Sequence, residues 1–443
     1  MSETTQDRFG GLAALRPPRR RSTLATDDGL RGTIPEIPEG SARLAELLGA
    51  MPVRNRFGEH LALRRWFAEP IGGEPPEHRV DGTALRLLVP DASADAANPQ
   101  QWLFLDTETT GLAGGTGTYA FLVGIAWWDA GGLQVEQLFM RDHSEEYSLL
   151  VALAERMAER CVLVTFNGKS FDWPLLETRY RMTRSIRLPA PRAHLDFLHP
   201  ARTLWRLRLG SVRLPELERH VLRWNRGVDV ASELIPTIYF DFLRGGPPEP
   251  LLPIFYHNQM DLRGLAGLAE RVLSVLAAPS AGNRDGLELF GVSRICERRG
   301  EAARARKLYE ESIACELPPD TARMARKALA SLAKRDGDFP LAYELWSETL
   351  GISREGFEAY EQLAIYYERR ARDWHRAAVL VRKALADLHR ANHVGMLPPG
   401  VCLRYLRRFE KRLARLERKA GHAMLEAMSA AKTESNVLAG ESN

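Results

Sequence analysis

The stretch Trp102–Glu108 constrains the fold of this chain more than any other. Four apolar residues, Trp-Leu-Phe-Leu, are followed by Asp106, Thr107 and Glu108. Side chains alternate between the two sides of a strand, so Asp106 and Glu108 project to the same side. Two carboxylates held close together repel each other unless a cation lies between them. The pattern therefore predicts a strand that ends either in a divalent-cation site or in an ordinary hairpin with polar ends.

A second segment of the same kind begins at Cys161. The apolar run Cys161–Phe166 is followed by Asn167-Gly168-Lys169-Ser170-Phe171-Asp172. Asn and Gly are turn residues, and Ser170 is the predicted N-cap of a helix over residues 173–182. Asp172 then lies in the first turn, where an acid either belongs to a site or complements the helix dipole.

A third candidate segment lies near the start of a helical stretch that runs to about Leu276. It reads Tyr256-His257-Asn258-Gln259-Met260-Asp261. His257 and Asp261 stand four residues apart and therefore share one face of the helix. The chain thus offers four acids and one histidine from three separate segments.

These motifs, in this order, resemble those of the DEDD (DnaQ-type) exonucleases of the ribonuclease-H-like superfamily. Residues 106–111 are similar to the family's Asp-x-Glu motif, and residues 167–172 match its Asn-x-x-x-Phe-Asp motif. The YprB-like branch is the most similar, since Thr-Gly-Leu-x-Gly-Gly-x-Gly-Thr at 110–118 and Phe-Leu-Val-Gly at 121–124 follow the first motif. The resemblance covers about residues 80–278. It implies a metal-dependent nuclease, most often a 3′–5′ exonuclease.

The resemblance also implies the ligands of two metal ions. Asp106, Glu108, Asp172 and Asp261 are expected to hold them, with Asp106 bridging both and Asp172 acting through water. Mg²⁺ and Mn²⁺ prefer carboxylate oxygen and water, so an all-acid cluster suits either ion. Two such ions lower the pKa of a water and stabilise both the attacking and the leaving oxygen of a phosphodiester.

The general base is left open between two neighbouring residues. One DEDD subgroup has His five positions before the last acid and another has Tyr four positions before it. Here Tyr256 is five before Asp261 and His257 is four before it, so the two residue types are exchanged. His has the pKa better suited to accepting a proton from water, so His257 is favoured over Tyr256.

Further contacts to substrate are expected from residues beside the acids, namely Thr107, Asn167, Lys169 and Tyr256. Lys169 alternatively is a solvated turn residue. Asp196 ends the short predicted strand His194–Phe197 and is an accessory candidate: it either joins the metal site, caps the next helix, or binds His194 or Arg202.

Composition limits the partners and the compartment. The net charge is only +4, so binding to nucleic acid requires local basic segments, of which there are three: 179–192, 202–213 and 404–419. Each is equally consistent with a solvated helix face. The four cysteines show no Cys-x-x-Cys spacing, which together with the lack of a long apolar run predicts a cytoplasmic protein that does not cross a membrane.

The sequence predicts an α/β fold in which helices flank a mixed sheet. Residues 1–40 are expected to be disordered, 41–80 to be a helical lead-in, and 81–278 to be the ribonuclease-H-like domain. Within it, 83–89 reads as an edge strand, and 119–128 and 133–140 read as a hairpin. The helix 145–159 then leads to 161–166, which we expect to pair in parallel with the first strand.

After Pro279 the pattern becomes entirely helical and repeats. The intervals from Ala305 to Ala342 and on to Ala377 are 37 and 35 residues, close to the ~34 of a tetratricopeptide repeat (TPR). Residues 283–420 therefore resemble a TPR-like all-α domain, which implies a protein partner, although any helical hairpin bundle would share much of this pattern. Residues 421–443 are expected to be a flexible tail.

Three functions remain open on sequence alone. The favoured one is a metal-dependent nuclease that removes nucleotides from a 3′ end of single-stranded nucleic acid, DNA or RNA. The alternatives are a structure-specific endonuclease on the same fold and a non-catalytic nucleic-acid-binding scaffold. The presence of all four acids argues against the scaffold.

Overall fold

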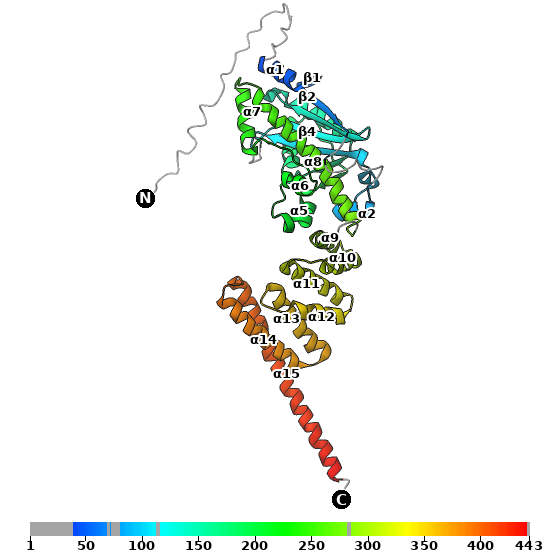
Figure 1. Cartoon of the computed structure of the whole chain (residues 1–443), viewed down its shortest axis with the longest axis vertical. Coiled ribbons are helices and arrows are strands. Elements are labelled where there is room, and N and C mark those ends of the chain that lie inside the picture. The colour runs from blue at the N-terminus through cyan, green and yellow to red at the C-terminus, as the bar shows by residue number, and fades with distance from the viewer. Residues whose placement is uncertain (1–38, 69–70, 72–79, 112–115, 281–284, 441–443) are drawn as a thin grey trace, which may run out of the picture. The chain divides into compact units, whose positions relative to one another are not determined.

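The computed structural model describes residues 39–440 except 69–70, 72–79, 112–115 and 281–284 (Figure 1). Of the predicted disordered segment 1–40, residues 1–38 lie outside the described residues, as does most of the glycine run after Gly111, whereas Glu39 and Gly40 begin a helix. Residues 40–443 belong to one compact unit. None of the described helices is long and apolar enough to cross a membrane.

One mixed sheet of seven strands organises the first half of the chain. The interior strand β3 pairs in parallel with β6, and β6 pairs in parallel with β7, while all other neighbours are antiparallel. This confirms the predicted hairpin and the predicted parallel pairing. In spatial order the strands are β1 (Met51–Asn55), β2 (Gly58–Phe67), β5 (Gly132–Phe139), β4 (Ala120–Asp129), β3 (Trp102–Thr109), β6 (Val162–Thr165) and β7 (Ala193–Asp196).

Two predicted elements are wrong. Residues 51–67, expected to be helical, form the hairpin β1–β2, because 61–67 pair along their length with β5. Residues 83–89, expected to be a strand, belong to helix α2 (Gly82–Leu88). Asp81 caps that helix by accepting hydrogen bonds from the backbone N–H groups of Thr83 and Ala84, a start signal typical of helices.

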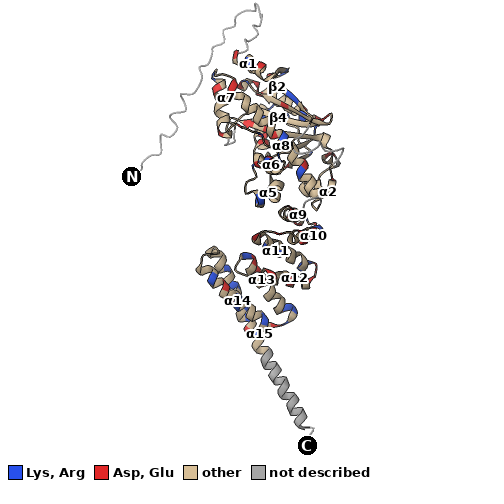
Figure 2. Cartoon of the chain, in the orientation of Figure 1, with Lys and Arg blue, Asp and Glu red and all other residues tan. Residues whose placement is uncertain are grey.

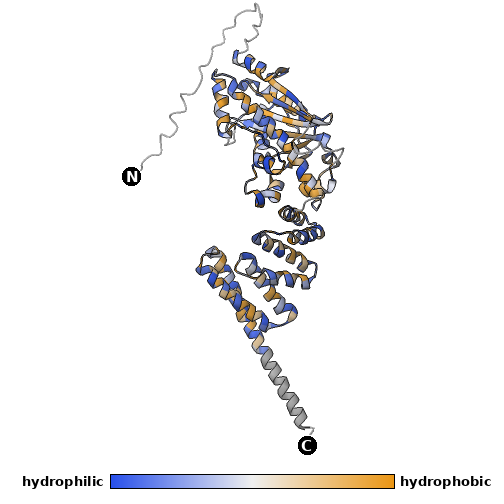
Figure 3. Cartoon of the chain, viewed as in Figure 1, coloured by the Kyte–Doolittle hydropathy of each residue, from blue (hydrophilic) through white to orange (hydrophobic). Residues whose placement is uncertain are grey.

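Helices cover both faces of the sheet. α8 (Leu252–Ala277) crosses β3, β4 and β5 on one face, and α3 (Glu146–Glu159) packs against β2 and β5. The strands are apolar along most of their length (Figure 3). Trp102 and Phe104 join the core beneath α8, whereas Leu103 and Leu105 join the core on the opposite face. Asp106 and Glu108, which continue the first series, therefore project toward α8.

The sheet-containing half of the chain has several further helices. They are α1 (Glu39–Leu48), α4 (Asp172–Thr183), α5 (Leu198–Leu209), α6 (Leu214–His220) and α7 (Ile235–Leu243). The segment 221–231 between α6 and α7 has no regular structure. It passes beside α8 and contributes side chains to the site.

The second half of the chain is helical, as predicted. Neighbouring helices pack in sequence order, and the predicted small residues Ala305, Ala342 and Ala377 are fully buried. The assignment of this region to the TPR class stays a prediction. α15 continues to Gly440, past residue 421 where the tail was expected to begin. The helices are α9 (Gly286–Arg298), α10 (Ala302–Ala314), α11 (Pro319–Arg335), α12 (Phe339–Thr349), α13 (Arg354–Tyr366), α14 (Trp374–His393) and α15 (Pro399–Gly440).

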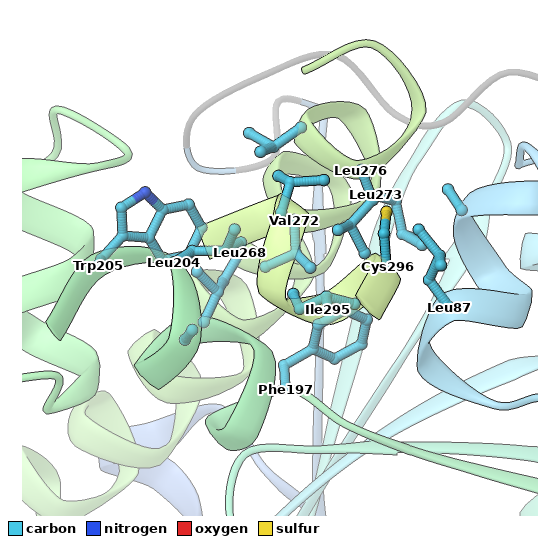
Figure 4. Close-up of a cluster of buried hydrophobic side chains, with 14 of the residues drawn as sticks. Leu87, Phe197, Leu204, Trp205, Leu268, Val272, Leu273, Leu276, Ile295 and Cys296 are labelled. Atoms are coloured by element: carbon cyan, nitrogen blue, oxygen red, sulfur yellow. The ribbon is translucent and has the colours of Figure 1, made fainter. Parts of the chain in front are cut away.

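Helix α9 is packed directly onto the sheet-containing half. Ile295 and Cys296 of α9 lie in the same apolar cluster as Leu204 and Trp205 of α5 and Val272 of α8 (Figure 4). Figure 4 also shows Leu87, from α2, beside Cys296. The two halves of the chain therefore share a continuous core.

Candidate active site

Strand β3 and helix α8 bring the first acids of the site together. Asp106 is half-buried and Glu108 is buried, and both face α8. The side-chain amide of Asn258 on α8 donates a hydrogen bond of 2.8 Å from Nδ2 to Asp106 Oδ2. Gln137 on β5 donates from Nε2 to Asn258 Oδ1 at 2.8 Å, which fixes the orientation of that amide.

The close approach of α8 to the sheet depends on Gly124. This residue pairs with Asp106 across β4 and β3. A Cβ atom at position 124 would lie 2.1 Å from Asn258 Oδ1, far inside van der Waals contact. Only glycine therefore lets Asn258 reach Asp106.

Asp172 reaches the site from the start of α4. Thr107, which points to the opposite face from its two acidic neighbours, donates from Oγ1 to Asp172 Oδ1 at 2.6 Å. The predicted cap Ser170 does not cap the helix; α4 begins after Phe171, which makes no side-chain cap hydrogen bond. Asn167 has a positive φ of 70°, which shapes the turn between β6 and α4.

Asp196 holds that turn in place. Its carboxylate accepts hydrogen bonds from the backbone N–H groups of Asn167 and Lys169, each at 2.9 Å, and from that of Leu198 at 3.1 Å. Thr165 Oγ1 donates a further hydrogen bond at 3.3 Å. Among the alternatives considered for Asp196, this geometry matches the helix-capping role, because Leu198 begins α5.

Helix α8 supplies the remaining two predicted residues. His257 Nε2 lies 3.5 Å from Asp261 Oδ2 and 3.9 Å from Glu108 Oε1. The hydroxyl of Tyr256 donates instead to the backbone carbonyl of Arg226 at 3.0 Å. The imidazole is thus among the acids, whereas the phenol is engaged by the 221–231 segment.

The sequence analysis missed Asn258 and Gln137, described above, and a further group of site residues: Glu218, Arg226 and Asp229. The Arg226 side chain is 4 % exposed, and its Nη2 lies 2.6 Å from Glu218 Oε1 and 2.7 Å from Asp261 Oδ1. Asp229 accepts from Arg226 Nη1 at 3.0 Å and also lies 2.7 Å from His257 Nδ1. Arg226 and Asp229 lie in the irregular segment 221–231, and Glu218 of α6 belongs to no recognised motif. Only the tertiary structure therefore reveals these three residues as part of the site.

The electrostatics of the site reflect a concentration of negative charge. Burial raises the pKa of the Asp106 carboxyl well above its usual value, and the charges of Asp261 and Asp172 raise it further. Burial likewise raises the pKa of Glu108, followed by the charges of Asp106 and Asp261. Burial raises the pKa of Asp172, against the hydrogen bond from Thr107. Carboxylates from β3, α4 and α8 therefore act on one another at short range.

Of the three residues Glu218, Arg226 and Asp229, the arginine is the one whose positive charge offsets the acids. Burial raises the pKa of Glu218 to about 7 although Arg226 opposes the shift. For Asp229, burial is outweighed by the hydrogen bond and charge of His257 and by Arg226, so the pKa of Asp229 is lowered. Among the described residues, Arg226 is the one arginine that forms ion pairs with these acids.

The donor set fits a hard divalent cation. Four carboxylates supply only oxygen ligands, and Asp261 Oδ1 is buried and pairs with Arg226 Nη2 at 2.7 Å. Within the part of the chain that the structure describes, no three His, Cys, Asp or Glu side chains already form a metal-binding cluster. Asp106 and Asp261 instead turn toward Asn258 and Arg226.

Comparison with known proteins identifies the family. A family model described as RNase_H superfamily matches residues 103–273, which include all four acids. The protein named "Uncharacterized protein YprB" from Bacillus subtilis (strain 168) is 30% identical over 334 residues, covering 74% of this chain and 77% of the relative. A domain of this superfamily indicates a nuclease-type hydrolase that binds nucleic acid, and such nucleases generally use divalent metals. The chain therefore belongs to the YprB family, with a ribonuclease-H-like domain that carries the acid cluster.

Proposed function

We propose that this protein is a metal-dependent 3′–5′ exonuclease with a DEDD carboxylate cluster. Asp106, Glu108, Asp172 and Asp261 would hold two Mg²⁺ or Mn²⁺ ions, which would supply charge stabilisation and a more acidic water. The observation that carries the proposal is that carboxylates from three distant segments, Glu108 buried and the others half-buried, lie close enough for their charges to raise the pKa of Asp106 and of Glu108. Arg226 offsets part of this negative charge, and bound divalent cations would offset the rest.

His257 is the proposed general base. Asp229 Oδ1 lies at hydrogen-bonding distance from Nδ1, so the proton is assigned to Nδ1 and the lone pair of Nε2 faces Glu108 and Asp261. An unprotonated Nε2 among these acids is suited to take a proton from an attacking water. Tyr256 is the less favoured base, because its hydroxyl donates to the carbonyl of Arg226.

Residues beside the acids position the site and its substrate. Thr107 orients Asp172, and the turn that contains Asn167 sets the start of α4. Lys169 is exposed and is the proposed phosphate contact. We further propose that the C-terminal helices form a TPR-like domain, with 81–278 and 283–420 as the two domains.

The proposal is tested with the full-length chain and 5′-labelled single-stranded DNA and RNA in Mg²⁺, Mn²⁺ or EDTA. We expect a ladder of shortening products that requires metal. Asp106→Ala should reduce cleavage by more than the ~10–100-fold typical of losing an outer-shell partner. The exposed Asp91→Ala serves as the control and should cleave normally.

Other outcomes separate the alternatives. Discrete internal cuts would favour the endonuclease, and binding without cleavage in any metal would favour the scaffold. Equal activity of the Asp106→Ala and Asp91→Ala proteins would refute the acid cluster as the catalytic site.

A further inference from the structure

A pocket of about 350 Å³ lies where helix α9 meets the sheet-containing half of the chain. Its wall combines the turn before α4, the end of β7, the start of α5, the end of α2 and the end of α9. The residues that the argument uses are Lys169, Asp196, His199, Arg298 and Arg299. None of them belongs to the proposed metal ligands.

The lining of the pocket is positively charged. Lys169, Arg298 and Arg299 are exposed, and within the described residues none of the three forms an ion pair with an acid. Arg299 donates from Nε to the carbonyl of Leu87 at 2.7 Å. The single acid, Asp196, already accepts four hydrogen bonds from its own surroundings. Two cationic heads, those of Lys169 and Arg298, are thus left to meet an anion.

The turn before α4 links the pocket to the acid cluster along the chain. Lys169 lies three residues before Asp172, and its backbone N–H is fixed by Asp196. An extended strand that has a phosphodiester at the acids and runs along this turn would therefore meet the pocket with a neighbouring phosphate.

The position of Arg298 is fixed by the packing of α9. A Cβ atom on Gly291 would lie 2.8 Å from the carbonyl oxygen of Thr203, so α9 and α5 are in close backbone contact. Trp205 Nε1 donates to Glu288 Oε1 at 2.6 Å, and Arg271 Nη2 lies 3.2 Å from Glu288 Oε2. These contacts, made by the first half of α9, hold that helix against the sheet-containing half, and the last turn with Arg298 then lines the pocket.

We infer that this pocket binds a backbone phosphate of single-stranded nucleic acid, so that the first helix of the C-terminal region forms part of the substrate-binding surface. The inference rests on the proposed nuclease function for the path of the strand. Phosphate contacts by Lys and Arg supply affinity and position without reading sequence. The helical region then takes part in binding the substrate itself.

The test measures binding of a 5′-fluorescein-labelled single-stranded oligonucleotide to the full chain over a range of salt concentrations. Asp106→Ala is present in every protein to prevent cleavage. Arg298→Glu and Lys169→Ala should each weaken binding, Arg298→Glu by roughly tenfold. Each should also make the slope of log K against log salt less negative by ~0.7, the change for one phosphate contact on a single strand. His199→Ala should change the slope less.

The matched control is Arg335→Glu. Arg335 is exposed and, like Arg298, lies in the last turn of its helix, but it is in α11 and does not line the pocket. Its affinity and salt slope should stay at the reference values. If Arg298→Glu and Lys169→Ala behave like this control, the pocket is not a phosphate site.

Kinetics with the native acids separate the two proposals. Arg298→Glu should raise KM with little change in kcat, because Arg298 is remote from the reacting atoms. A chain that never cleaves but loses affinity on Arg298→Glu would refute the nuclease and retain the pocket. A chain that cleaves with an unchanged KM in the same variant would refute the pocket alone.

Discussion

At the scale of single residues, the geometry of the site depends on Asp229, whose carboxylate contacts both His257 and Arg226. Asp229 contacts both His257 Nδ1 and Arg226 Nη1, and Arg226 in turn contacts Asp261. A carboxylate beside one ring nitrogen fixes the imidazole tautomer and its orientation. Asp229 thereby acts as a positioning residue for the proposed base.

Replacing the Asp229 carboxylate by an amide keeps the size of the side chain but should remove its control of the His257 tautomer. In Asp229→Asn, the amide N–H can donate to Nδ1 and favour the other tautomer. We expect kcat to fall by ~10–100-fold, in line with other outer-shell partners, with KM nearly unchanged. NMR of ¹⁵N-labelled histidine should show the Nδ1-protonated form in the parent protein and its loss in the variant.

The comparison variant is Asp241→Asn, which alters an exposed acid paired with Arg244. It should leave both kcat and the ring spectrum unchanged. An unaltered histidine spectrum in Asp229→Asn would show that Asp229 does not set the tautomer.

The sequence predicts some of these residues and not others for a physical reason. Asp106, Glu108 and His257 can be placed because a strand or helix period fixes the direction of each side chain. Arg226 and Asp229 lie in the irregular segment 221–231, where no period applies. Their position follows from tertiary contacts alone.

At the scale of elements, the contact between β4 and α8 sets the distance between the strand acids and the helix acid. The backbone of Gly124 lies under Asn258, which hydrogen-bonds to Asp106. A single methyl group at this position must displace the helix, the amide or both. The site geometry is therefore sensitive to a residue that bears no functional group.

Gly124→Ala should lower the free energy of unfolding by about 1–3 kcal/mol, the usual cost of overpacking, and reduce cleavage. Urea unfolding and the oligonucleotide assay measure the two effects. Gly117→Ala is the control, because a Cβ there would have no heavy atom within 4 Å. Adding Asn258→Ala should recover part of the stability by removing the clash; strict additivity of the two changes would contradict a direct contact.

Elements were predicted well where periodicity and turn residues agree. The hairpin of β4 and β5 and the helix α3 follow from such patterns. Residues 51–67 were assigned incorrectly because pairing with β5 decides their conformation. Strand preference depends on neighbours in this way more than helix preference does.

At the scale of the whole molecule, the change of pattern at Pro279 does not coincide with a break in the core. Leu268 and Val272 of α8, Leu204 of α5 and Ile295 of α9 belong to one buried cluster (Figure 4). Farther along, Lys and Arg recur on α14 and on the described part of α15 (Figure 2). Helix α9 therefore covers part of the hydrophobic core of the ribonuclease-H-like half.

A chain that ends after Ala278 should therefore be unstable or aggregate. Uncovering side chains such as Leu204 and Val272 costs roughly 1.5–3 kcal/mol each. Thermal unfolding and light scattering should show a large loss relative to the full chain. A chain that ends after Gly421 keeps every residue of the described apolar clusters and should melt normally. A soluble, cooperatively unfolding 1–278 fragment would contradict the shared core.

The order of strands limits how copies of this protein can associate. The two outermost strands are β1, which contains Pro52 and Arg54, and β7, which has only four residues. Proline has no N–H to donate, and a charged or short border strand discourages another chain from adding to it. Joining of sheets between molecules, edge to edge, is thereby disfavoured.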